Sequence, residues 1–367
     1  MNNSKICIVS TANVKHMTLI SLYTDILKAY NIEFDIVYLD RYGIVEDIGA
    51  NKVYKLCKNI TPKTTKKEKL RYFIEFRNFS KNIINNNNYD LVIVWNTLTS
   101  LLLADVLLKN KKKYILNIRD YYFEKNFIIY YLHKQLIRNS IFTTISSKGF
   151  LDFLPRAKYI FVHSLNEEII NLNEEQNYTF GRKNDPINIG FLGNVRFYEV
   201  QKKIINLLGN DDRFRLWYCG TNSEPLEEYV FERNIKNCEF TGEFSPSETE
   251  FYLNKFDIIN NIFGSKDISV KTLTPIRLYY STNYKIPILV NKDTYLGNLV
   301  EEFNLGLTLD ENELNFADKL YNYFINLKSD EYIKATQKFN ELVINENNLF
   351  KNKFKSLVIR LKEKNEQ

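Results

Sequence analysis

The sequence has few residues of the types that hold small folds or metal sites together. Its 367 residues include only four cysteines and three histidines. The cysteines are scattered and form no CxxC pair: Cys7, Cys57, Cys219 and Cys238. This pattern excludes a disulfide scaffold and a cysteine zinc site, and so few histidines argue against a histidine-rich metal centre. We therefore expect no metal or other cofactor, and free thiols suit a reducing cytoplasm.

Long apolar runs are also missing. No stretch approaches the roughly 18 apolar residues that a membrane span needs, and the opening MNNSKICIVS lacks the pattern of a signal peptide. Seven prolines and twelve glycines are too few for a fibrous or low-complexity chain. With 44% hydrophobic and 26% charged residues, the composition predicts a folded protein, soluble or peripherally bound to a membrane. The length is enough for two domains.

Positive charge is concentrated in the first half. Residues 1–180 carry 25 Lys+Arg against 17 Asp+Glu, a net charge of +8, whereas the remainder carries 25 against 27. Basic clusters occur at Lys63, Lys66, Lys67, Lys69, Arg71 and Arg77, and at Lys109, Lys111, Lys112 and Lys113. A solvated helix face is the ordinary explanation. The alternative is an anionic membrane surface or a phosphate-bearing acceptor, because aromatic residues interleave with the first cluster: Tyr72, Phe73, Phe76 and Phe79. No nucleic-acid-binding motif accompanies the charge.

Strand and helix patterns alternate along the first half. The predicted strands are KICIVS, FDIVYLD, YDLVIVW, KYILNIRD, FTTISS and KYIFVHS. Helical spacing marks LISLYTDILKAY, EKLRYFIEFRNFSKNII and LLLADVLLKN, and the asparagines at 85–88 are expected to break the second of these helices. Because only crossover helices can join parallel strands, the pattern predicts a parallel sheet covered on both faces.

A second round of alternation follows a polar linker at 171–186. It begins with the strand INIGFLGN and continues through KKIINLLGN, FRLWYCG, LEEYVFERN, CEFTGEF, FDIINNIF, IRLYYSTNY and IPILVN to GNLVEEFN. We predict a doubly wound α/β fold in three parts: a domain over 1–180, a second over 187–330, and a helical segment over 331–367. Two such domains imply a ligand cleft between them, at the carboxyl ends of the strands.

The second half offers three candidate sites. The glycine turn at Gly193 leads through Asn194 and Arg196 towards a helix, so its free N–H groups could meet a diphosphate; a plain turn is the alternative. Lys271 and Arg277 flank Pro275, which can start a helix. Cations there suit a leaving diphosphate, although surface charge explains them equally well. The third candidate comprises Gly242 and Glu243, at a strand end where a base could bind; an ordinary β-turn is the alternative.

In the first half, polar residues follow three predicted strands. They are Asn13 and His16, Trp95 and Asn96, and Arg119 and Asp120. Strand ends of a parallel sheet share one edge, so these residues are expected to face the same cleft. His16 is a candidate proton carrier, and a structural ion pair is the alternative for Arg119 and Asp120. His133 has the pattern of a surface or packing residue, whereas His163, at a strand end, could face the cleft or cap a helix.

Together these segments resemble a GT-B glycosyltransferase, specifically a bacterial member of glycosyltransferase family 4 of the capsular or cell-surface polysaccharide type. The resemblance covers nearly the whole chain. It is carried by NIRDYYFE (117–124), FTTISSKGFLDFLP (142–155), IGFLGNVRF (189–197), FTGEF (240–244) and KTLTPIRLYYSTNYKIPILV (271–290). In the last segment Arg277 and Pro287 keep the family's spacing between a basic residue and the proline of the next strand.

The resemblance implies a donor nucleotide on the second half, with its diphosphate near Arg196, Lys271 and Arg277. It also implies an acceptor on the basic first half, retention of anomeric configuration, no metal, and a C-terminal helix that crosses back to the first domain. Two departures stand out. Thr272 and Tyr280 occupy the positions of the family's acidic pair, and Arg119-Asp120 stands where a histidine is usual. The proton-accepting role is open between Asp120 and the leaving phosphate.

The main hypothesis is a metal-independent, retaining glycosyltransferase, cytoplasmic and peripheral to the membrane. It would transfer a sugar from a UDP-linked donor to a lipid-linked or growing surface polysaccharide. In this hypothesis the two domains close to exclude water around the reacting groups. Two alternatives remain open: a nucleotide-sugar epimerase of the same fold, which would need no acceptor, and a degenerate, non-catalytic scaffold in a polysaccharide assembly complex.

Overall fold

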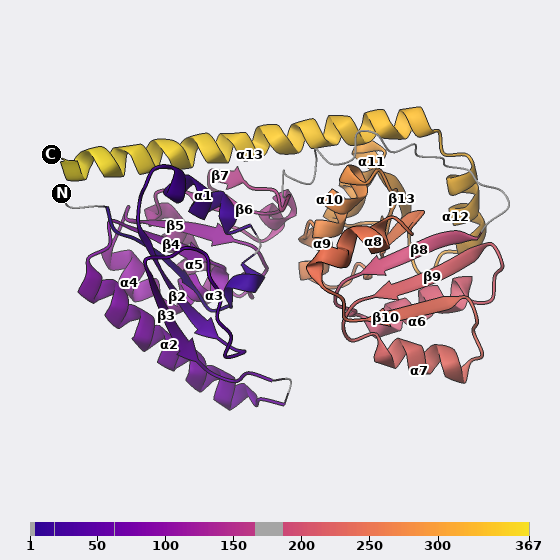
Figure 1. Cartoon of the computed structure of the whole chain (residues 1–367), viewed down its shortest axis with the longest axis horizontal. Helices are drawn as coiled ribbons and strands as arrows, with labels where there is room; N and C mark the ends of the chain where they lie inside the picture. The colour runs from indigo at the N-terminus through magenta and orange to yellow at the C-terminus, as the bar shows by residue number, and fades with distance from the viewer. Residues whose placement is uncertain (1–3, 18, 62, 166–185, 367) are drawn as a thin grey trace. The chain divides into compact units, whose positions relative to one another are not determined.

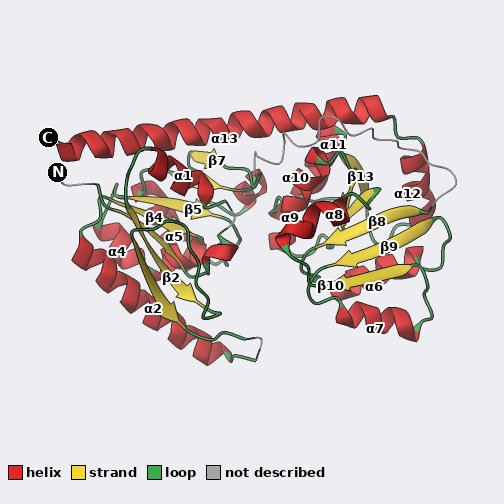
Figure 2. Cartoon of the chain, viewed as in Figure 1, coloured by secondary structure: helices red, strands yellow, loops and turns green. Residues whose placement is uncertain are grey.

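The chain folds into two compact units. The computed structural model describes residues 4–17, 19–61, 63–165 and 186–366. One unit comprises Met1–Ser164 together with Asn345–Gln367, and the other comprises Leu165–Ile344. Each contains one parallel sheet flanked by helices (Figure 2), which confirms the predicted doubly wound α/β class. The linker predicted at 171–186 lies, except for Pro186, outside the described residues.

The first unit is built on a seven-stranded sheet with the order β3-β2-β1-β4-β5-β6-β7 (Figure 1). Its strands are β1 (Ile6–Ser10), β2 (Phe34–Asp40), β3 (Lys52–Cys57), β4 (Leu91–Trp95), β5 (Tyr114–Ile118), β6 (Thr143–Ile145) and β7 (Tyr159–Phe161). Every pairing is parallel. Ser10 pairs with Trp95 at the last rung of β1 and β4, so the loops after these two strands leave from the same edge.

Helices connect these strands. They are α1 (Ser21–Ala29), α2 (Lys66–Asn87), α3 (Thr97–Leu102), α4 (Ala104–Lys109) and α5 (Phe127–Asn139), with short 3₁₀ turns η1 (Val14–His16) and η2 (Lys148–Asp152). A capping box between Thr65 and Glu68 begins α2. The helix ends within the asparagine run, as predicted: α2 continues through Asn87, and Asn88 adopts the left-handed conformation. The single helix predicted over 101–110 is interrupted at Leu103.

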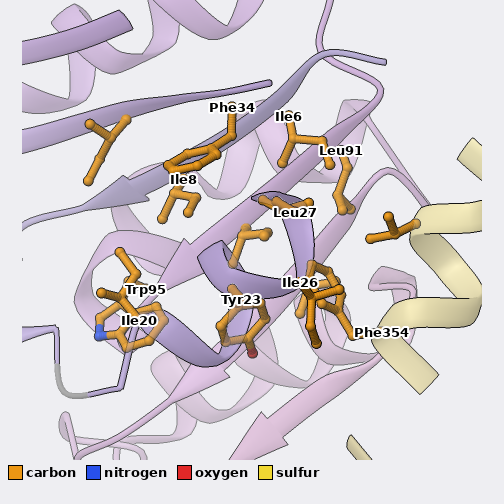
Figure 3. Packing of buried hydrophobic residues seen from close by; sticks show 14 of the residues in the cluster. Ile6, Ile8, Ile20, Tyr23, Ile26, Leu27, Phe34, Leu91, Trp95 and Phe354 are labelled. Atoms are coloured by element: carbon orange, nitrogen blue, oxygen red, sulfur yellow. The ribbon is translucent and has the colours of Figure 1, made fainter. Parts of the chain in front are cut away.

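Apolar side chains from distant parts of the chain share the first unit's core. Ile6 and Leu91 from the sheet, Tyr23 from α1 and Phe354 from the C-terminal helix belong to one buried cluster (Figure 3). The ring of Tyr23 meets the ring of Phe354 edge-on, with centroids 5.1 Å apart. This cluster covers one face of the sheet and extends to Trp95, the last residue of β4.

The second unit has a six-stranded sheet with the order β10-β9-β8-β11-β12-β13. Its strands are β8 (Ile187–Leu192), β9 (Phe214–Cys219), β10 (Cys238–Gly242), β11 (Ile258–Asn261), β12 (Ile288–Asn291) and β13 (Gly306–Leu309). Its helices are α6 (Tyr198–Leu208), α7 (Glu224–Glu232), α8 (Thr249–Leu253), α9 (Ile268–Thr272), α10 (Ile276–Asn283), α11 (Tyr295–Phe303) and α12 (Phe316–Ile325), with a short 3₁₀ turn η4 (Pro246–Glu248). Two apolar clusters contain alternate residues of the strands, with Phe191 in one and Leu192 in the other.

The C-terminal helix α13 (Ser329–Glu366) belongs to both units. In its first part, Phe339 and Val343 are buried in a cluster of the second unit. In its last part, Phe350 and Phe354 are buried in the core of the first unit. His163 also contacts this helix, because its Nε2 lies 2.6 Å from Glu346 Oε2. Among the described residues, no helix is both long enough and apolar enough to cross a membrane.

Candidate active site

A pocket of about 280 Å³ lies at the carboxyl edge of the first unit's sheet. Its walls include Thr11 and Ala12, which follow β1, and Trp95 and Asn96, at the end of β4. The strand order reverses between β1 and β4, and this switch point is where doubly wound sheets bind ligands. Asn96 has a left-handed φ of 67° and caps α3 by accepting a hydrogen bond from the Thr99 backbone. The chain therefore changes direction at Asn96, between the end of β4 and the start of α3.

Five of the residues that the sequence singled out line this pocket together: His16, Trp95, Asn96, Arg119 and Asp120. The sixth, Asn13, is fully buried. Its amide donates to Asp40 Oδ1 and to Glu46 Oε2, each at 2.9 Å, and its oxygen accepts from the Arg41 backbone N–H. Asn13 thus fixes the loop after β2 against η1.

His16 lines this pocket with an imidazole ring. Its Nε2 lies 2.9 Å from the Tyr42 hydroxyl. Desolvation lowers the pKa of His16, and the positive charges of Lys15 and Arg41 lower this pKa further. The imidazole is therefore neutral at pH 7, where one ring nitrogen can accept a proton.

Arg119 and Asp120 follow β5 directly and differ in their surroundings. Arg119 is half-buried: its guanidinium lies 5.4 Å from the centre of the Trp95 ring, and its Nη1 donates to Ser164 Oγ at 3.1 Å. Asp120 is exposed to solvent at the pocket wall. Arg119 is thus held by packing, whereas the Asp120 carboxylate is accessible to a bound molecule.

Sequence reasoning missed Asp40, Arg41 and Glu46, which support the pocket from the loop after β2. Asp40 is fully buried and accepts hydrogen bonds from the backbone of Tyr42 and Gly43. Arg41 lines the pocket and donates from Nη2 to the Thr11 carbonyl at 2.9 Å. The available signal was the charged Asp-Arg pair at the end of the predicted strand FDIVYLD, the same type of signal as Arg119-Asp120 after β5.

We expect the first unit to lose part of its stability as the pH falls and Asp40 becomes protonated. Burial raises the pKa of Asp40, but hydrogen bonds from Asn13, Tyr42 and Gly43 and the charge of Lys55 outweigh burial and hold this pKa at about 2, below the 3.8 of the free side chain. A lowered folded-state pKa stabilises the protein above about pH 4 by about 2 kcal/mol, and this contribution disappears as the pH falls towards 2. Asp40→Asn should remove it.

The measurement is the free energy of unfolding by urea between pH 2 and pH 7. Asp40→Asn should be less stable than the natural protein at pH 7, and the two should converge at low pH. Asp25→Asn, on the exposed side of α1, is the matched control and should follow the natural protein. A constant difference at every pH would contradict the assignment.

A buried acid and a buried histidine lie behind the Asp120–Tyr122 turn. Glu124 and His133 are both fully buried, with Oε1 and Nδ1 3.8 Å apart. The other carboxylate oxygen of Glu124 accepts from the backbone of Tyr122, which lines the pocket. Desolvation raises the pKa of Glu124 and lowers that of His133 to about 4, so the His133 ring is neutral at pH 7. Of the two sequence interpretations of His133, surface or packing, the structure therefore supports packing.

In the second unit, the loop after β8 forms a tight glycine turn at the corresponding switch point. Gly193 has φ 103°, and its N–H donates to the Cys219 carbonyl at 2.8 Å. Gly220 has φ 141° and lies so close that a Cβ there would approach the Gly193 oxygen to 2.1 Å. Only a residue without a side chain fits this contact. In the sequence, Gly220 carries no separate signal, because it stands at the end of the apolar strand pattern FRLWYCG.

Arg277 lies against this turn. It lies in the first turn of α10 and is buried, with 8% of its surface exposed. Nε donates to the Leu192 carbonyl at 2.6 Å and Nη1 to Asn261 Oδ1 at 3.1 Å, while the guanidinium stacks over Phe191. Burial lowers the pKa of Arg277 to about 9, and the nearby Arg196 charge contributes. The side chain is therefore still a cation at neutral pH, fixed beside the glycine turn.

The other cations are exposed. Arg196 follows the turn, and Lys271 lies in the last turn of α9 rather than at a helix start. Pro275 is the residue before the first turn of α10, as expected for a helix start. Asn194 accepts a hydrogen bond at its side-chain oxygen from Asn222 at 2.8 Å. The site therefore combines one rigid buried cation with two cations that can adjust to a ligand.

The two positions that depart from the family pattern differ in their exposure. Thr272 is fully buried, and its hydroxyl donates to the Ile268 carbonyl at 2.7 Å. Tyr280 is half-buried; burial raises its pKa, while the charge of Arg277 lowers it. Gly242, with φ 66°, ends β10, and Glu243 after it is exposed. Of Thr272 and Tyr280, Tyr280 is thus the more accessible to a ligand.

Comparison with known proteins identifies the fold. No family model and no curated protein sequence matches this chain. Among solved structures, sucrose-phosphate synthase from Thermosynechococcus elongatus is similar with a TM-score of 0.67, at 11% identity over 96% of this chain and 100% of that one. Anabaena HepE, solved with UDP and glucose, has a TM-score of 0.64 at 11% identity, covering 96% and 100%. The lipopolysaccharide outer core galactosyltransferase WaaB has 0.61 at 12% identity, covering 95% and 98%.

These neighbours are glycosyltransferases of the GT-B fold, and the likeness extends over nearly the full length of each chain. At such low identity the likeness establishes the fold alone. The protein therefore has the α/β fold of the GT-B class, with two parallel-sheet units.

Proposed function

We propose that this protein is a glycosyltransferase that uses a nucleotide sugar. The observation that carries the proposal is the buried Arg277 cation fixed against the Gly193 turn, at the switch point of the second sheet. A purely structural role would not require a positive charge in this place, because burying an unpaired charge is unfavourable. A bound diphosphate would offset that charge. HepE, which shares the fold, was solved with UDP and glucose, and this supports a UDP-linked donor here.

Three cations serve the leaving diphosphate in this proposal. Arg277 provides a preorganised guanidinium, and Arg196 and Lys271 close on the phosphates from exposed positions. Preorganised cations stabilise the negative charge that develops as the glycosidic bond breaks, and guanidinium groups match phosphate geometry with paired hydrogen bonds. Such a set can act without a divalent metal. Tyr280 is assigned to the ribose or the sugar as a hydroxyl partner, and Glu243 to the region of the base.

The acceptor is assigned to the pocket of the first unit. Asp120 presents a carboxylate and His16 a neutral imidazole to this space, so either can accept a hydrogen bond from the attacking hydroxyl. The pocket wall that orients this hydroxyl is formed by Arg119, Trp95 and Asn96. We assign a retaining reaction and a lipid-linked saccharide of a surface polysaccharide as the acceptor, which would bring the protein to the cytoplasmic face of a membrane.

Nucleotide binding tests the proposal directly. A ligand at about 100 times its Kd stabilises the folded protein by about 2.7 kcal/mol. We expect UDP, but not GDP, CMP or ADP, to raise the Tm in the presence of a chelator. The control is Arg277→Ala, which should lose the shift. If no nucleotide shifts the Tm of the folded natural protein, the proposal fails and a non-catalytic scaffold becomes the better explanation.

A further inference from the structure

The first two turns of α5 project apolar side chains into solvent. Phe127 is 79% exposed, Ile128 74% and Tyr131 55%, and Phe123, just before the helix, is 62% exposed. Buried residues of α5 occur only in its later turns, at His133 and beyond. Four large apolar residues within nine positions form an exposed patch of a kind that marks interaction surfaces.

Positively charged residues flank these side chains in the sequence. Lys125 and Arg138 are exposed and Lys134 is half-exposed, while the one acid between residues 123 and 138, Glu124, is fully buried. Among the described residues, these three cations form no ion pair. We call Phe123, Lys125, Phe127, Ile128 and Tyr131 the α5 patch. Its surface combines aromatic and aliphatic groups with cations only, which is the chemistry that favours the interface of an anionic bilayer.

The basic helix α2, which the sequence suggested for such a role, has a different surface. Phe76 is fully buried, and Tyr72, Phe73 and Phe79 are half-buried. Its charges are also partly neutralised, since Arg77 pairs with Asp105 at 2.9 Å. The exposed apolar residues of α2 are instead Leu70 and Ile74. The aromatic side chains of α2 therefore serve packing, while those of α5 remain available.

We propose that the α5 patch binds the surface of an anionic membrane. Phe127 and Ile128 enter the headgroup region, and Lys125 contacts anionic lipid headgroups. The patch adjoins the acceptor pocket in the chain, because Phe123 follows Tyr122, which lines that pocket. The membrane contact would thus hold the pocket near lipid-borne molecules. The link to an acceptor rests on the proposed function, whereas membrane binding itself does not.

Vesicle co-sedimentation tests this inference with the full chain. The probes are vesicles of phosphatidylcholine with and without phosphatidylglycerol. We expect the natural protein to bind the mixed vesicles and to lose most binding without phosphatidylglycerol. Phe127→Ser combined with Ile128→Ser should lower the partition coefficient at least about tenfold, because two apolar side chains no longer insert. Lys125→Glu should also weaken binding to the mixed vesicles.

Two controls define the surface. Phe231→Ser, at a site 86% exposed on α7, should bind vesicles like the natural protein. Leu70→Ser combined with Ile74→Ser should do the same if α5, not α2, is the contact. Equal binding by the α5 variant and the natural protein would overturn the inference, and so would a natural protein that binds no vesicles. Vesicle binding without any nucleotide-induced Tm shift would leave this inference intact while the proposed function fails.

Discussion

Replacing Arg277 by alanine should lower sugar transfer about 100-fold or more, which is the loss typical of removing a preorganised group that stabilises transition-state charge. The same variant should lose about 1–2 kcal/mol of unfolding free energy, because two hydrogen bonds to Leu192 and Asn261 disappear. A loss of this size leaves the protein folded. Turnover with UDP-sugars, UDP affinity and urea unfolding measure the three quantities.

Arg196→Ala is the matched control, since it removes a cation that is exposed. We expect weaker UDP binding, by about tenfold or less, and an unchanged unfolding free energy. Near-normal turnover in the Arg277 variant would refute the assignment of this residue to the diphosphate. A loss of folding in that variant, with transfer fully retained by the folded fraction, would refute it as well.

The second large effect is expected at Gly220. An alanine there would place its Cβ 2.1 Å from the Gly193 oxygen and would force a side chain into φ 141°. Because the neighbouring atom is backbone, the turn itself must move. We expect a loss of at least about 3 kcal/mol of unfolding free energy. UDP should also cease to stabilise the protein, because the displaced Gly193 turn is the one against which Arg277 is fixed.

Gly242→Ala separates this contact from the general effect of a left-handed glycine. Gly242 has φ 66°, but no atom lies within 4 Å of the position that a Cβ would occupy. Its substitution should cost only about 1 kcal/mol. Equal losses in the two variants, measured by urea unfolding, would show that the backbone conformation, and not the close approach to Gly193, determines the effect.

Most of the fold was predictable because each central strand is a nearly continuous apolar run. The exceptions lie at the edges of the two sheets. In β3 (KVYKLC) every residue is exposed or half-exposed, so its polar composition hides the strand. In β13 (GLTL) most residues are half-buried in the same way. An edge strand has one neighbour and partial cover, and hydrophobic periodicity therefore weakens where the sheet ends.

The candidate site was predictable in part, for a related reason. Residues that directly follow buried strands gather at one edge, which is why His16, Asn96 and Asp120 share a pocket. The direction of each side chain does not follow from this rule, so Asn13, in the same loop as His16, is buried instead. The burial of Arg277, on α10, could not be predicted from the sequence either, because it depends on contacts with Phe191 from β8 and Asn261 from β11.

The shared helix α13 has a consequence for the order of folding during synthesis. The core of the first unit includes Phe350, Phe354 and Val358, which follow the whole second unit in the chain. Domains usually fold as they emerge from the ribosome, the N-terminal one first. Part of the first unit's apolar surface therefore stays uncovered until Phe350, Phe354 and Val358 have been synthesised and have left the ribosome. Chaperone contact during translation should therefore persist on the first unit until the last turns of α13 emerge.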